Sequence, residues 1–386
     1  KCRTPPERLA AIAGDQTDLE TMAAAMDLFA RLGCENLDCR QDGARLDASR
    51  RDFYLFNATI AGIDVADAIL LVGTNPRWEA AVLNARIRRR WLSGACEIAL
   101  IGEARDLTYR YHHLGIGPTA MHALLGGSGG FAATLRAASR PMIVVGQGAL
   151  ARPDGAAVLA ASWTLARHVG ALRPDWHGFN VLHCAAARVG GLDLGFLPGP
   201  AGRDLQAILD GARTGEVETV LSLGADELDP GDLGAAFLIH IGTHGGPMAA
   251  RADVLLPGSA FTEKDGTYVN TEGRVQVAPR AVFPPGDARE DWAILRALSE
   301  AVGSPLPYDT IDEVRRRLAR VQRLASPLGV GCDDPAGPSG DPAAMSDRPF
   351  VSPITDFFRT DPIGRASPTM AACAALAATA PAMAAE

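Results

Sequence analysis

Cysteine and histidine are the residues through which this chain could bind a metal ion or an iron–sulfur cluster. It has seven cysteines and eight histidines, but no Cys-x-x-Cys pair, and four residues separate the closest two cysteines, Cys34 and Cys39. Clusters and structural zinc sites draw on closely spaced ligands. The spacing therefore predicts no metal site, and the odd, scattered set of cysteines favours reduced thiols.

His240 and His244 stand four residues apart, a spacing that on a helix could hold a metal ion. However, the apolar run Phe237–Ile241 is typical of a strand, and glycines surround His244. The pattern favours a glycine loop at the carboxyl end of a strand. Open α/β sheets bind ligands at that edge, so His244 is retained as a residue of a vestigial ligand site.

The segment Gly146-Gln-Gly148-Ala-Leu-Ala151 follows an apolar run and partly matches the dinucleotide-binding fingerprint. Such a turn brings backbone N–H groups to a pyrophosphate. Pro153 and Asp154 separate this turn from the next helix, and the acidic ribose partner expected about twenty residues later is missing. An ordinary strand-to-helix turn is the favoured interpretation, and a free-standing NAD-binding module is the weaker alternative.

Charge and hydropathy limit the partners that the chain can have. Of its 386 residues, 47% are hydrophobic, and the formal net charge is −8. A net negative chain without a basic stripe is not expected to bind nucleic acid. No apolar run is long enough to span a bilayer, so no direct membrane span is expected.

Apolar runs alternate along the chain with amphipathic stretches, separated by glycine turns. Strands are expected at Leu9–Ala13, Ala68–Gly73, Glu97–Ile101, Met142–Gly146, Thr219–Gly224, Phe237–Ile241 and Val254–Leu256. Helices are expected at Asp18–Leu32, Trp78–Trp91, Gly155–His168, Asp204–Ala212, Arg289–Ala301 and Ile311–Arg323. Continuous apolar strands that alternate with helices predict an α/β fold with doubly wound parallel sheets.

Composition also suggests how the chain is divided. A glycine-rich stretch precedes residue 138, so residues 1–138 are expected to form one α/β unit and residues 139–325 a second. Residues 326–353 are rich in Pro, Gly and Asp and are expected to form a mobile or extended linker. Residues 354–386 hold Phe357 and Phe358 before an Ala-rich tail, and exposing two adjacent aromatic rings is unfavourable. This last part is expected to dock, on its own chain or on a partner.

Several longer motifs resemble one family. They are Leu70-Leu-Val-Gly-Thr-Asn-Pro76, Ala252-Asp-Val-Leu-Leu-Pro-Gly258, Gly266-Thr-Tyr-Val-Asn-Thr-Glu-Gly-Arg274 and Thr360-Asp-Pro-Ile-Gly-Arg-Ala-Ser367. Together they resemble the molybdopterin oxidoreductases and, within them, the large iron–sulfur (G-type) subunit of respiratory complex I. The resemblance implies doubly wound sheets of the molybdopterin-oxidoreductase type.

The resemblance also implies a function. The large iron–sulfur subunit carries [2Fe–2S] and [4Fe–4S] clusters in an N-terminal region, and this chain is expected to begin after that region. It is expected to be the non-catalytic scaffold part, without a cofactor, of an NADH–quinone oxidoreductase that couples electron transfer to proton translocation. Its expected partners are other subunits of the hydrophilic arm of the complex. The implied location is the cytoplasmic face of the bacterial inner membrane, or the matrix side in mitochondria, with peripheral attachment through the complex.

The alternative is a catalytic molybdopterin enzyme similar to formate dehydrogenase. In such relatives a metal ligand follows the second helix, and the matching stretch Glu35–Gly43 offers Cys39 or Asp42. The histidine expected after that ligand is missing, and the cofactor-gripping loops are degenerate. No catalytic residue is therefore predicted. The residues predicted to be vestiges of cofactor binding are Cys39, Asp42, Gly73, Asn75, Gly146, Gly148 and His244.

Overall fold

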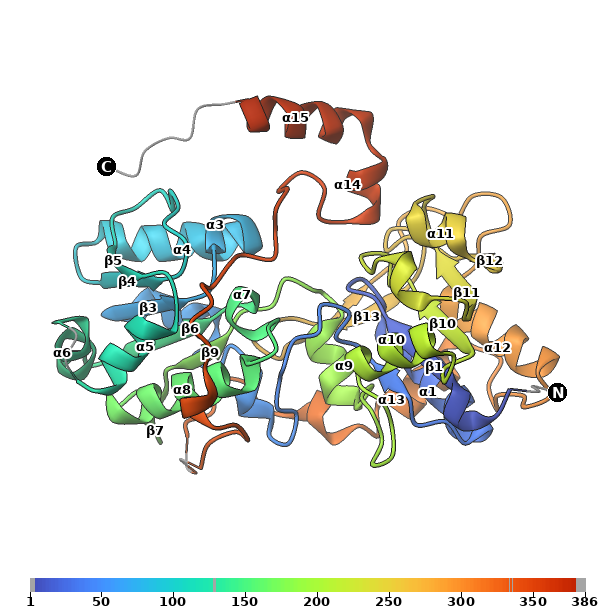
Figure 1. Ribbon diagram of the computed structural model, residues 1–386, viewed down its shortest axis with the longest axis horizontal. Coiled ribbons are helices and arrows are strands. Elements are labelled where there is room, and N and C mark those ends of the chain that lie inside the picture. Colours follow the sequence, from blue (N-terminus) through green and yellow to red (C-terminus); the bar gives the residue numbers. More distant parts are fainter. Residues whose placement is uncertain (1–3, 128–129, 333, 335, 380–386) are drawn as a thin grey trace.

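The computed structural model describes residues 4–127, 130–332, 334 and 336–379, and it contains two five-stranded parallel sheets (Figure 1). The first sheet has the order β12(Val254–Pro257), β11(Phe237–Gly242), β10(Thr219–Leu223), β1(Leu9–Ala13) and β2(Leu37–Asp38). The second has the order β5(His112–Gly115), β4(Glu97–Ile101), β3(Ala68–Val72), β6(Pro141–Val145) and β9(Phe179–Val181). Every pairing within both sheets is parallel.

Burial of the central strands explains why their sequences are continuously apolar. Every residue of β1, β3 and β6 is buried. Parallel strands reach this state because the crossover helices cover both faces of the sheet. The predicted α/β fold with doubly wound parallel sheets is therefore confirmed.

Six of the longer helices follow the predicted positions. They are α1(Leu19–Leu32), α4(Ala81–Leu92), α8(Gly155–His168), α10(Leu205–Thr214), α12(Asp291–Ala301) and α13(Ile311–Leu318). The helices α5(Pro118–Leu125) and α6(Gly130–Ala137) are additional to the six that were expected. Shorter helices are α2(Thr59–Gly62), α3(Pro76–Glu79), α7(Gln147–Leu150), α9(Arg188–Leu194) and α11(Pro247–Arg251). Local capping fixes several ends: the Asp18 carboxylate accepts the Thr21 N–H at 2.7 Å to begin α1, and Gly33 ends it with a left-handed backbone.

Each sheet takes strands from both sides of residue 138. The first unites β1 and β2 with β10, β11 and β12, and the second unites β3, β4 and β5 with β6 and β9. The expected division at residue 138 thus does not separate the two sheets, because the chain leaves the first sheet, builds the second and then returns. Two small antiparallel pairs, β7(Leu172–Arg173) with β8(Trp176–His177) and β13(Gly266–Val269) with β14(Val275–Ala278), complete the strands.

The described residues of 331–361, here called the C-terminal strap, run in extended form across the body of the molecule (Figure 1). The side chain of Phe350 is 1% exposed, and its N–H donates to the Ile116 carbonyl at 2.8 Å. The Arg152 guanidinium donates to the Arg348 carbonyl at 2.7 Å. The stretch expected as a mobile or extended linker is therefore extended, but it is packed against the second sheet and its helices.

The strap leads into α14(Pro362–Ala366) and α15(Pro368–Thr379). The ring of Phe357 lies 6.4 Å from that of Trp78 in α3, and Arg365 in α14 donates to Asp226 at 2.7 Å. Residues 353–366 thus contact both sheet halves of their own chain. Among the described residues, no helix combines the length and hydropathy needed to cross a bilayer.

Candidate functional site

A cavity of about 420 Å³ lies where the carboxyl ends of strands from both sheets meet the strap. The body contributes residues that follow β1, β2, β3, β6, β9 and β10, and the strap and α14 contribute residues between Pro353 and Arg365. This edge is where open α/β sheets bind ligands, so it is the candidate site of the fold. Its lining is strongly acidic: Asp15, Asp42, Glu79, Asp226, Glu227, Asp356 and Asp361 against Arg359 and Arg365.

A buried arginine beside the cavity neutralises part of this charge. Arg188 in α9 is 1% exposed, and its Nη2 lies 2.9 Å from Asp42 Oδ1 and 3.7 Å from Asp15 Oδ1. Burial alone would lower the pKa of Arg188, but the two carboxylates outweigh it and raise that pKa. For Asp42 burial likewise opposes ionisation, yet the Arg188 charge holds the pKa below its usual value. Asp42 is therefore engaged by an internal ion pair.

Asp15 behaves differently from Asp42. Burial, aided by the charges of Asp42 and Glu227, raises the pKa of Asp15 from 3.8 to about 7 despite the nearby Arg188. Two carboxylates thus share the Arg188 guanidinium. Asp15, which lies farther from it than Asp42, retains its proton up to neutral pH.

Cys39 does not face the cavity. The cysteine is 1% exposed, and a Cβ added to Gly191 of α9 would lie 2.7 Å from its Sγ, so the thiol packs against that helix. Burial raises the pKa of Cys39 to about 12. A buried, protonated thiol is a poor metal ligand, since coordination requires the thiolate. Cys39 and Asp42, the two alternative ligands of this stretch, therefore lie in different surroundings: the thiol packs against α9, and the carboxylate pairs with Arg188.

The three glycines predicted as vestiges of a cofactor site are tightly covered. A Cβ at Gly146 would lie 2.4 Å from the Thr74 side chain, and one at Gly73 would lie 2.6 Å from Ala149. At Gly148 a Cβ would lie 2.3 Å from the Val351 carbonyl of the strap. The turns after β3 and β6 are thus pressed together, and the strap backbone covers the turn that partly matches the dinucleotide fingerprint.

Asn75 and the neighbouring Glu79 also meet the strap. The Asn75 N–H donates to Glu79 Oε1 at 2.8 Å, and the Ser352 hydroxyl donates to the same oxygen at 2.8 Å. Burial raises the pKa of Glu79. The strap therefore supplies a hydrogen bond to a buried carboxyl of α3 at the place where the fold would otherwise admit a ligand.

His240 and His244, which stand four residues apart in the sequence, lie in different environments. His240 lies in β11, is 2% exposed, and its Nδ1 lies 2.9 Å from the Ser222 hydroxyl of β10, while burial lowers its pKa. His244 is half-buried, and its Nδ1 lies 2.9 Å from the hydroxyl of the adjacent Thr243. Because the segment is a strand followed by a loop, the four-residue spacing does not bring the two rings together as a helix would.

The motif spanning Ala252–Arg274 is joined to distant parts of the chain by one buried ion cluster. Lys264 is 4% exposed, and its ammonium lies 2.7 Å from Asp18 at the start of α1 and also contacts Asp291 at the start of α12. The local ion pairs in and next to the motif are Arg251 with Asp253 and Arg274 with Glu272. Lys264 therefore joins three segments that are distant in sequence.

Sequence reasoning missed Arg188, Asp15 and His183. His183 follows β9; its Nε2 lies 2.6 Å from the Tyr54 carbonyl, and burial lowers its pKa to about 4. The available signal was a pair of charged residues, Arg188 and Asp193, within the otherwise apolar run Ala185–Leu194, since a charge on a short apolar helix requires a partner.

Comparison with known proteins defines the family of this chain. The molybdopterin oxidoreductase family matches residues 1–301. The chain belongs to the molybdopterin oxidoreductase family. In addition, residues 331–373 match the C-terminal region of the G-type subunit of NADH-ubiquinone oxidoreductase. This second match covers the whole strap together with α14 and the first half of α15.

Related sequences confirm the resemblance to the large iron–sulfur subunit of complex I. The chain is 40% identical over 380 residues to the mitochondrial NADH dehydrogenase [ubiquinone] iron-sulfur protein 1 of Solanum tuberosum, covering 96% of this chain and 50% of that protein. It is 36% identical to the G-type subunit of the NADH-quinone oxidoreductase of Rickettsia bellii, covering 95% and 52%. The chain thus spans about half the length of the curated relatives that it matches.

Solved structures of other proteins share the fold. Acetylene hydratase from Pelobacter acetylenicus superposes with a TM-score of 0.56 at 14% identity, covering 88% of this chain and 63% of that one. A chain of the formyltransferase/hydrolase complex from Methylorubrum extorquens gives 0.53 at 18% identity, covering 81% and 93%. At these identities the likeness concerns the fold alone.

Proposed function

We propose that this chain is the non-catalytic scaffold half of the large iron–sulfur subunit in a respiratory NADH–quinone oxidoreductase. In that role it uses the molybdopterin-oxidoreductase fold as a rigid body on which other subunits assemble. The observation that carries the proposal is the path of the strap: Val351 and Ser352 occupy the carboxyl edge of the second sheet. A fold whose ligand edge is filled by its own chain is suited to support rather than to catalysis.

The residues at this edge do not fit a molybdopterin cofactor. A pyrophosphate needs a glycine turn whose backbone N–H groups are open to it, and the Val351 carbonyl covers the turn at Gly148. The charged residues that line the remaining cavity are mainly acidic, and carboxylates repel a phosphorylated group. The candidate metal ligand Cys39 is a buried thiol that faces α9. These three features also disfavour the formate dehydrogenase-like alternative, and the covered Gly148 turn disfavours NAD binding.

The wider setting follows from the same proposal. The [2Fe–2S] and [4Fe–4S] clusters of the large iron–sulfur subunit belong to the other half of the relatives' length, and this chain supports them without wiring electrons itself. Its partners are other subunits of the hydrophilic arm. The chain then lies peripherally at the cytoplasmic face of the bacterial inner membrane, or at the matrix side in mitochondria.

Elemental analysis tests the proposal directly. The purified chain should contain no molybdenum or tungsten and release no fluorescent pterin on oxidation, and equilibrium dialysis with NADH should give no saturable binding. About one molybdenum or tungsten per chain would overturn the scaffold role in favour of the catalytic alternative. Saturable micromolar NADH binding would instead revive the NAD-binding module.

A further inference from the structure

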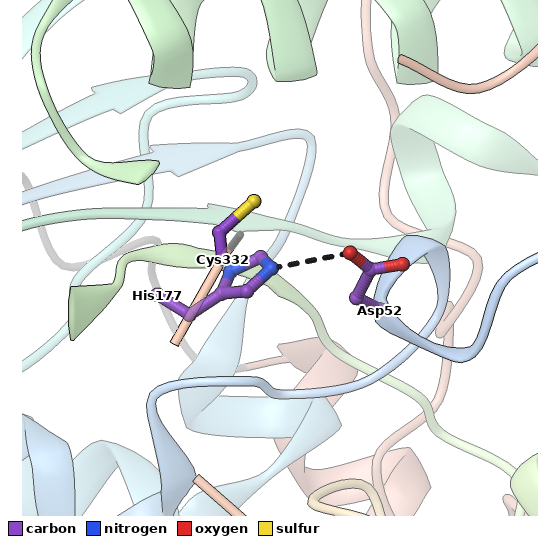
Figure 2. A group of neighbouring side chains, drawn as sticks. All are labelled: Asp52, His177 and Cys332. Atoms are coloured by element: carbon purple, nitrogen blue, oxygen red, sulfur yellow. Dashed lines mark hydrogen bonds and ion pairs between the residues drawn. The ribbon is translucent and has the colours of Figure 1, made fainter. Parts of the chain in front are cut away.

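Three potential metal ligands from distant segments of the chain lie close together (Figure 2). Asp52 lies in a short 3₁₀ turn, Arg51–Phe53, His177 lies in β8, and Cys332 lies near the start of the strap. One ligand atom from each lies within 4.8 Å of the other two, and His177 Nε2 is 3.5 Å from Asp52 Oδ2. The cluster stands apart from the cavity at the carboxyl ends of the strands, since none of its members lines that cavity.

The histidine is built into the fold with one nitrogen unused. His177 is 4% exposed, and its Nδ1 has no hydrogen-bond partner among the described residues. The ring packs edge-on against Trp163 of α8, with centroids 5.7 Å apart, which fixes its orientation. The nitrogen that faces Asp52 is Nε2, so a metal bound between the three side chains would be held by Nε2 in this fixed ring orientation.

The backbone holds the cysteine in place as well. Cys332 is 7% exposed, and its N–H donates at 2.9 Å to the carbonyl of Arg173 in β7, the strand that pairs with the β8 strand of His177. The thiol is thus positioned from the strap side, while Asp52 and His177 are positioned from the body. An ion bound by all three side chains would link the strap to the part of the molecule that contains the second sheet.

The donor set selects the ion. One sulfur, one imidazole nitrogen and one carboxylate oxygen form a mixed set that suits Zn²⁺, whereas Mg²⁺ and Ca²⁺ prefer oxygen alone. Zinc–ligand bonds of about 2.0–2.3 Å place tetrahedral ligand atoms about 3.5 Å apart. His177 Nε2 and Asp52 Oδ2 already have this separation, so only the Cys332 sulfur has to approach, by about 1 Å at most. The fourth position of the tetrahedron is left for water.

The surrounding charges balance a divalent ion. Arg50 donates to both carboxylate oxygens of Asp52, at 3.1 and 2.5 Å, and to the Asp334 carboxylate at 2.8 Å. While the thiol is neutral, Arg50, Asp52 and Asp334 together carry a net charge of −1. Binding of Zn²⁺ with release of the thiol proton brings the total to zero. A carboxylate has about four acceptor positions, so Asp52 can keep Arg50 as an outer partner and bind the metal as well.

We propose that Asp52, His177 and Cys332 form a structural zinc site that fastens the C-terminal strap to the second sheet half. The site is independent of the scaffold role, and it runs against the absence of metal ligands predicted from sequence spacing.

Metal analysis of the full chain tests the site. After loading with Zn²⁺ and dialysis, the chain should retain about one zinc, and Zn²⁺ should raise its thermal midpoint relative to a chelator-treated sample. Cys332→Ser and His177→Asn should each bind Zn²⁺ at least ~10-fold more weakly. The matched controls Cys373→Ser in α15 and His168→Asn at the end of α8 should bind zinc like the unmodified chain.

Cobalt substitution gives a reading that does not depend on any variant folding. Co²⁺ bound to the unmodified chain should show the near-ultraviolet sulfur-to-cobalt charge-transfer band, and Cys332→Ser should lose it while keeping its far-ultraviolet circular dichroism. Failure of the unmodified chain to retain zinc, or absence of the cobalt band from it, would overturn the proposal. Zinc retention by Cys332→Ser equal to that of Cys373→Ser would do the same.

Discussion

The turns after β6 and β11 each follow an interior strand of a parallel sheet, yet they have opposite surroundings. At Gly148 the strap lies so close that an added Cβ would come within 2.3 Å of the Val351 carbonyl. At Gly245, in the loop after β11, the residue is exposed and an added Cβ would meet nothing within 4 Å. The same kind of sheet edge is closed in one half of the molecule and open in the other.

The two turns occupy equivalent positions in the fold, but only one of them is covered by another part of the chain. Both sheets present glycine turns at their carboxyl ends, as ligand-binding α/β proteins do. The second is closed by residues 350–352, which lie about two hundred positions further along the chain. The first depends instead on the ion cluster of Lys264, which ties the loop after β12 to α1 and α12. The strap contact at Gly148 and the buried ion cluster of Lys264 can therefore be disrupted by separate substitutions.

Loss of the Lys264 ammonium should have the largest effect on the first half. Lys264→Met leaves Asp18 and Asp291 buried without their shared cation, and removing one partner of a buried ion pair typically costs about 3–5 kcal/mol. Urea denaturation should show that loss in the free energy of unfolding. Arg274→Met, which breaks a pair whose arginine side chain is 56% exposed, should cost less than about 1 kcal/mol. Equal losses in the two variants would show that the Lys264 cluster has no special structural role.

A single methyl group should distinguish the closed turn from the open one. Gly148→Ala must displace the backbone of Val351 or Gly73, and overpacking of this kind costs about 1–3 kcal/mol. Limited proteolysis should then cut the strap sooner than in the unmodified chain. Gly245→Ala should leave both stability and proteolysis unchanged, because its Cβ has open space. Unaltered proteolysis of Gly148→Ala would mean that the strap is not held at this turn.

The pH dependence of the acidic cavity should give the smallest effect. Asp15 has its pKa raised from 3.8 to about 7 by burial, so its contribution to stability is full below about pH 4 and is lost as pH rises through about 7. Asp15→Asn, which cannot ionise, should match the unmodified chain near pH 4. At pH 8 it should be more stable by on the order of 1 kcal/mol, a value reduced because the Asp15 side chain is 24% exposed.

Urea denaturation from pH 4 to pH 8 measures this difference. His183 has a lowered pKa and opposes the trend over part of this range, but it is present in both proteins and cancels in the comparison. A stability difference that does not change with pH would show that Asp15 is not the titrating group.

Much of the fold could be predicted from local sequence. The apolar runs at Leu9–Ala13 and Ala68–Val72 are strands, and Gly155–His168 is a helix with the predicted bounds. These elements are recognisable because burial on both faces demands continuous apolar residues, and a helix demands a 3.6-residue period. The short strands β2 and β9 were missed, since two or three residues carry no readable period.

The candidate site could be predicted only in part. The glycines of the turns after β3 and β6 were found because glycine after an apolar run marks a turn. Their covering by Val351 could not be found, because nothing in the local sequence at residue 351 specifies a contact with residue 148. Asp52, His177 and Cys332 were missed for the same reason: each looks ordinary among its sequence neighbours.

The sequence by itself determined the α/β class, seven of the ten strands in the two parallel sheets, six of the longer helices, and the family, because these depend on local periodicity and on long contiguous motifs. Only the tertiary structure decided which strands share a sheet, which cysteine faces which environment, and which glycine turn is closed. Those outcomes depend on contacts between residues that lie far apart in the sequence. Such contacts form, and contribute to stability, only after the chain has returned to the first sheet and the strap has crossed both halves.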